Sequence, residues 1–95
     1  MDADFSSIHN HQEHTVFEAV MASRDRYPAL STSPDLLADV ACVALNRLPA
    51  RYIRHQVDFL FYLTERERAD LDDAVAAAVK HAFEFVQARV AMRAR

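Results

Sequence analysis

Glycine is absent from this chain of 95 residues, and its absence excludes several kinds of nucleotide-binding and catalytic site. Phosphate-binding loops, dinucleotide fingerprints and nucleophile elbows each need residues without a Cβ at fixed positions. A phosphate bound by this protein must therefore be held by side chains or by the N-terminus of a helix.

Cysteine, long apolar segments and strong net charge are also scarce. The single cysteine, Cys42, cannot form an internal disulfide, and it is expected to be a small buried apolar residue. No apolar run approaches the about 20 residues that span a bilayer, and the acidic N-terminus is unlike a signal peptide. The net charge of −3 gives no general attraction to nucleic acid or anionic membranes. We therefore expect a cytoplasmic protein whose anion-binding groups form a local cluster.

The apolar pattern predicts a mainly α-helical fold, a small helical domain with one strand. Residues 1–7 are polar and without a period, which predicts a flexible N-terminus before a single domain over residues 8–95. Apolar positions that repeat at about 3.6 residues predict three helices. These helices cover about residues 9–26, 34–46 and 65–92.

Short polar residues and prolines mark the expected helix ends. Ser33 can cap the second helix and Pro34 suits its first turn, while Thr64 opens a capping box for the third. Asn46 tolerates a left-handed conformation and is the expected stop signal of the second helix, since Pro49 prevents continuation.

A period of two interrupts the helical pattern after the second helix. Alternation over about ten residues predicts one strand at about residues 53–62. A lone strand leaves backbone groups unpaired, so the same strand of a second copy is its expected partner, antiparallel across a two-fold axis. Val57, Phe59 and Phe61 would then line the shared core of a homodimer.

The segment between the second helix and the strand carries the main candidate chemistry. Arg47, Arg51 and Arg54 lie within eight residues, beside Tyr52. Guanidinium groups bind phosphates in a bidentate way and stack on purines, and tyrosine adds an aromatic plane. The alternative is three ordinary surface arginines. Asp39 can face this segment and accept a hydrogen bond from Arg51, or it can be a solvated carboxylate.

A histidine-rich cluster near the N-terminus is the other candidate. His9, His11, Glu13 and His14 form pairs at helical spacing, but all four do not share one helix face. Zinc needs three or four convergent ligands, so we expect a solvated helix turn and no bound metal or cofactor. Because no acid–base pair or activated nucleophile is evident, we also expect no enzymatic activity.

The centre of the chain resembles the late competence protein ComFB family. The likeness lies in residues 37–41 (LADVA), 44–49 (ALNRLP) and 51–52 (RY), and more weakly in Ile8-His9-Asn10, Glu13 and Val16. Members of that family commonly carry three zinc-binding cysteines just before the LADVA segment. This chain has Ser31, Ser33 and Leu36 at those positions, so the zinc site is not carried over.

The resemblance implies a small receptor for cyclic dinucleotides, cyclic di-GMP above all. Arg51 and Arg54 are then expected to contact phosphate, and Arg47 or Tyr52 to stack on a base. The downstream protein partner is not indicated, and neither membrane nor direct nucleic-acid binding is expected. The alternative function is a ligand-free dimerisation or adaptor domain in a bacterial regulatory pathway.

Recognition of guanine is assigned to the first-helix motif. His9, Asn10 and Glu13 are expected to read a guanine edge. A carboxylate such as Glu13 or Asp39 would accept from N1–H and the exocyclic amine, a pattern that adenine does not offer.

Overall fold

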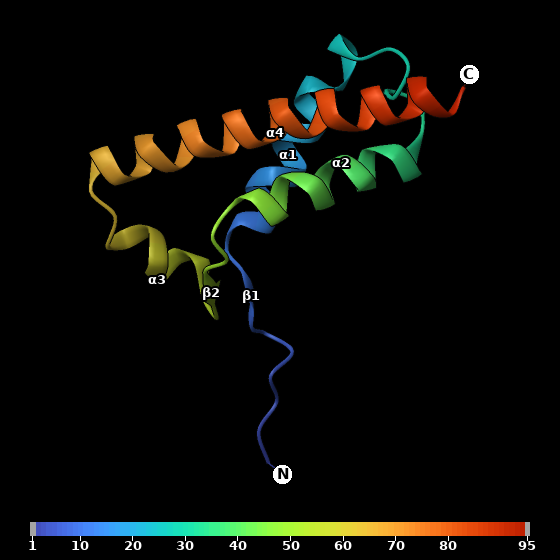
Figure 1. The fold of residues 1–95 in the computed structure, drawn as a ribbon. Helices are drawn as coiled ribbons and strands as arrows, with labels where there is room; N and C mark the ends of the chain where they lie inside the picture. Colours follow the sequence, from blue (N-terminus) through green and yellow to red (C-terminus); the bar gives the residue numbers. More distant parts are fainter. Residues whose placement is uncertain (1, 95) are drawn as a thin grey trace.

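The computed structural model describes residues 2–94, which form a mainly α-helical fold with one very small sheet (Figure 1). In chain order the elements are β1 (His9–Asn10), α1 (Gln12–Ser23), the 3₁₀ turn η1 (Arg24–Arg26), α2 (Pro34–Arg47), β2 (Tyr52–Ile53), α3 (Gln56–Phe61) and α4 (Glu65–Arg93). The predicted fold class is therefore confirmed. None of the helices described has an apolar stretch of the length that a membrane crossing requires.

The three long helices, α1, α2 and α4, pack around one core. α4 is 29 residues long and runs across both of the others (Figure 1). Phe83 on α4 is completely buried together with Val16 of α1 and Val40 of α2. The ring of Tyr27 stacks on Phe83, with centroids 4.3 Å apart. One face of α4 thus joins the other two helices and the loop between them.

The predicted starts of α2 and α4 are confirmed. The Ser33 hydroxyl accepts a hydrogen bond from the Leu36 N–H at 3.2 Å, and the Thr64 hydroxyl accepts one from the Glu67 N–H at 3.1 Å. Each bond satisfies one of the amide groups that a helix N-terminus leaves unpaired.

Two helix boundaries differ from prediction. α1 starts at Gln12 rather than near residue 9, because residues 9–10 form β1. α2 continues past Asn46, and the chain turns away at Leu48 with φ −99° and ψ 140°. An extended conformation is favoured there because Leu48 precedes Pro49. The left-handed stop expected at Asn46 is wrong, since none of the described residues has a positive φ.

The predicted strand over residues 53–62 is also wrong. Only Tyr52–Ile53 is a strand, and residues 56–61 form α3. β2 pairs antiparallel with β1, so its partner belongs to the same chain and the proposed strand pairing between two copies has no basis. Apolar side chains at both odd and even positions from Phe59 to Leu63 made the periodicity ambiguous, and a short apolar run of this kind fits a helix equally well.

Replacement of Phe83 tests the core. We expect Phe83→Ala to lower the free energy of unfolding by about 3–5 kcal/mol, because the fully buried ring leaves a cavity. Urea denaturation followed by circular dichroism measures the loss. Phe85→Ala is the matched control, since Phe85 lies on the same helix with 42% of its surface exposed. Equal losses in both variants would contradict this arrangement of the core.

Candidate functional site

The two short strands bring the first-helix motif beside the arginine-bearing segment. We call residues 9–12 and 49–53 the strand corner. Asn10 Oδ1 accepts hydrogen bonds from the N–H groups of Arg51 and Gln12, both at 3.2 Å. The N–H of His11 donates to the Arg51 carbonyl at 2.8 Å, and Gln12 Nε2 donates to the Pro49 carbonyl at 2.9 Å. The strand corner is therefore held by side-chain hydrogen bonds as well as by the backbone pairing of β1 and β2.

An aromatic ring from α3 packs onto this corner. The Phe59 ring lies 4.2 Å from the His11 ring, centroid to centroid, with the planes tilted by 46°. The Arg51 guanidinium carbon lies 4.9 Å from the centroid of the same ring. Such a cation–π contact holds a guanidinium in place without neutralising its charge. Arg51 is itself exposed, so its positive charge remains available to an anion.

Burial affects the chemistry of His11. Its surface is only 6% exposed, and loss of solvation lowers the pKa of this imidazole, with smaller contributions from the positive charges of Arg51 and His9. The neutral ring is therefore favoured. Its Nδ1 atom and Gln12 Oε1 are both buried without a hydrogen-bond partner among the described residues.

Most of the predicted ligand-binding residues gather at or beside the strand corner. Asn10 lies opposite Tyr52 in the ladder, and His9 lies opposite Ile53. Tyr52 is 70% exposed. Arg54 is exposed and lines a shallow hollow that is also lined by Phe59 of α3 and by Tyr62, which follows α3.

The remaining predicted residues are more scattered. Glu13 is half-buried in the first turn of α1. Arg47 Nη1 lies 3.4 Å from His81 Nε2 on α4, so its guanidinium is directed to that helix. Asp39 is exposed in a groove with Arg89 and Arg93 of α4, about 12 Å along α2 from Arg47 at 1.5 Å per residue. The structure does not bring Asp39 to Arg51.

The histidine-rich cluster is dispersed over separate contacts. His9 Nδ1 lies 3.0 Å from the Ser7 carbonyl, and His14 pairs with Glu18 at 2.9 Å, while His11 is buried against Phe59. Among the side chains that the structure describes, no three histidine, cysteine or acidic residues form a group that suits a metal ion.

One known protein family matches most of the chain. The family described as late competence development protein ComFB matches residues 9–90. The chain belongs to the ComFB family. The matched range begins at β1 and ends within α4, so it contains the whole strand corner and the core. No curated protein and no solved structure matches the chain.

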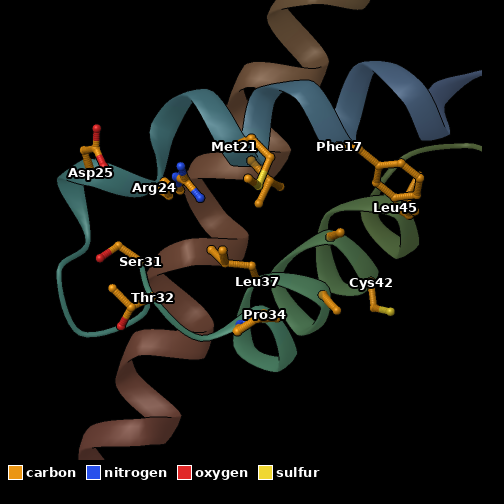
Figure 2. A pocket seen from close by; sticks show the side chains of 13 residues that line it. Phe17, Met21, Arg24, Asp25, Ser31, Thr32, Pro34, Leu37, Cys42 and Leu45 are labelled. Atoms are coloured by element: carbon orange, nitrogen blue, oxygen red, sulfur yellow. The ribbon is translucent and has the colours of Figure 1, made fainter.

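A larger groove of this ComFB-family chain lies elsewhere, between α1 and α2 (Figure 2). Its volume is about 790 Å³. Phe17 and Met21 stand on its α1 side, each about half exposed, and Arg24 lies toward one end (Figure 2). Cys42 lies on its α2 side and is exposed, which corrects the expectation that it is buried.

Sequence reasoning missed this groove and also the burial of two corner residues, His11 and Gln12. Phe17 and Met21 are one helical turn apart, just beside the buried positions Val16 and Val20, and that spacing was the available signal. Nothing in the pattern distinguished the buried His11 from its exposed neighbours, because its partner Phe59 is far away in sequence.

The buried imidazole predicts a pH-dependent stability. Because the pKa of His11 is lower in the folded state, the unfolded state binds more protons than the folded state once the pH falls to the usual histidine range. We therefore expect the stabilisation that depends on neutral His11 to be complete above about pH 6.5. The free energy of unfolding should decrease as the pH falls from there toward the lower folded-state pKa. Urea denaturation at several pH values between about 7.5 and 5.5 measures this slope. His11→Phe should reduce it, whereas His55→Gln, at an exposed position, should not; equal slopes would contradict the assignment.

Proposed function

We propose that this chain is a cyclic dinucleotide receptor without enzymatic activity, that cyclic di-GMP is its preferred ligand, and that the strand corner binds it. The observation that carries the proposal is the exposed Arg51 guanidinium held over the Phe59 ring. Exposed Tyr52 and Arg54 lie beside it. Membership of the ComFB family supports the same function.

The chemistry of the ligand matches these groups. A cyclic dinucleotide carries two phosphates and two purine bases, so it needs cations and flat surfaces in one place. In a chain without glycine, side chains must supply the phosphate contacts. Arg51 and Arg54 provide guanidinium groups, and Tyr52 provides a stacking plane. Arg47 contributes less in this proposal, because it contacts His81.

The proposed receptor acts as a homodimer through α3. Val57, Phe61 and Tyr62 are 79%, 82% and 79% exposed, and clustered exposed apolar side chains favour association. A helix of six residues is also too short to be stable without packing, since isolated helices below about 12–15 residues are marginal. A second copy of α3 would supply that packing and bring a second set of arginines near a ligand with two phosphates. The same patch supports the alternative of a ligand-free adaptor domain.

The ligand assignment predicts the effect of removing one arginine. Loss of a charge-assisted hydrogen bond costs about 1.5–3 kcal/mol, so Arg51→Ala or Arg54→Ala should weaken cyclic di-GMP binding by about tens-fold. Isothermal titration calorimetry measures the change. Arg26→Ala is the control, because this exposed arginine lies in η1, beyond the end of α1 that is far from the strand corner. Unchanged affinity in both corner variants would place the site elsewhere, and no binding by the wild type would leave the adaptor alternative.

The dimer assignment predicts that a charge on α3 separates the copies. Phe61→Asp would bury an unpaired carboxylate in the interface, at a cost of several kcal/mol. We expect light scattering at micromolar concentration to give the mass of a dimer for the wild type and of a monomer for this variant. Met92→Asp is the control, since Met92 is 71% exposed on the last turns of α4. A monomeric wild type would refute the proposal.

A further inference from the structure

A smaller hollow lies between α1, α3 and the first half of α4. Its volume is about 260 Å³. His11 and Gln12 line it at the start of α1, Leu60 lines it on α3, and Arg68 and Asp72 line it on α4. We call it the base pocket. It differs from the groove between α1 and α2, which shares none of these residues.

Two polar side chains of the base pocket are almost completely buried and incompletely paired. His11 is 6% exposed and Gln12 is 4% exposed. The Gln12 amide nitrogen donates to the Pro49 carbonyl, which can only accept, so the amide orientation is fixed and Oε1 is the free atom. His11 is held by its contact with Phe59. A buried polar atom without a partner destabilises the folded state, and a ligand that pairs with it recovers that loss.

The charges around the base pocket favour a neutral ligand with polar edges. Arg68 and Asp72 lie one turn apart on α4 and carry opposite charges, and His14 pairs with Glu18 on the α1 side. Because a histidine is charged only when protonated, the pocket is lined by one arginine and two carboxylates, which disfavours a lone anion and favours hydrogen-bond donors. A purely apolar ligand would leave Gln12 Oε1 unpaired. A planar heterocycle with hydrogen-bonding edges meets both requirements.

Guanine supplies the complementary set of donors and acceptors. Its N1–H and exocyclic amine can donate to Gln12 Oε1 and the Asp72 carboxylate, and its O6 can accept from Arg68. Adenine has no N1–H and no carbonyl at that edge. Leucine side chains such as Leu60 and Leu71 provide apolar walls for the ring faces.

We propose that the base pocket binds one guanine base of the ligand and that Gln12 and Asp72 recognise its edge. This inference rests on the proposed function and replaces the assignment of guanine recognition to Glu13 or Asp39. The Phe59 ring contacts both His11 of the pocket and Arg51 of the strand corner. One aromatic ring therefore separates the base from the proposed phosphate contact.

Isothermal titration calorimetry with cyclic di-GMP and cyclic di-IMP, the hypoxanthine analogue without the exocyclic amine, tests this pocket. We expect Asp72→Ala to weaken cyclic di-GMP binding by about tenfold or more, because a charge-assisted contact is lost, and to weaken cyclic di-IMP binding less. Asp73→Ala is the matched control, since it removes the neighbouring exposed carboxylate, which does not line the pocket. Gln12→Met, checked for folding by circular dichroism, should also reduce the preference for guanine.

The outcomes separate this inference from the proposed function. Wild-type affinity and selectivity in both Asp72→Ala and Gln12→Met would overturn the base pocket while the receptor function stands. If the wild type binds no cyclic dinucleotide, the proposed function fails, and titration with guanosine followed by amide NMR then decides on the pocket. Shifts confined to residues around His11, Gln12 and Asp72 would support it, and unchanged spectra would overturn it.

Discussion

The arrangement of the candidate site depends on a single side-chain amide. Asn10 Oδ1 accepts from the backbone of Gln12, two residues away, and from that of Arg51, 41 residues away. The first contact satisfies an amide at the start of α1, and the second holds the returning chain. Without it, the two residue pairs of β1 and β2 would keep only the bonds from the Gln12 side chain to Pro49 and from the His11 N–H to Arg51, and such a short sheet is marginal without further support. The positions of Arg51 and Tyr52 therefore follow from how Asn10 begins the first helix.

The same corner explains why α3 lies where it does. The Phe59 ring of α3 packs on His11 and Arg51, while Val57 and Phe61 of the same helix remain exposed. The rest of α3 makes weaker contacts, such as the 3.4 Å hydrogen bond from Arg68 to the Leu60 carbonyl. α3 is thus attached to the helical core at few points and bounded by hollows that other segments help to line.

Local features of the sequence predicted the long helices well, because their signals lie within a few residues of one another. Ser33 and Thr64 cap the next turn of chain, and the buried positions of α4 repeat with the helix period. The strand corner was not predictable in this way, since its contacts join distant segments. The region of Phe59 was misread because its apolar side chains fit two periodicities, and only the contact with His11 distinguishes them. The arginine segment was found from residue type alone, whereas the buried state of Gln12 needed the fold.

The position of Phe59 has a thermodynamic consequence. It belongs to the helix that carries the exposed apolar patch and also touches the arginine proposed to bind phosphate. Under the proposed function, a ligand that fixes this ring would favour association of two copies, and association would raise affinity for the ligand by the same factor, because linkage is reciprocal. The midpoint of the response would then depend on the concentration of the protein itself. Such a receptor would report the product of two cellular quantities, the messenger and its own abundance.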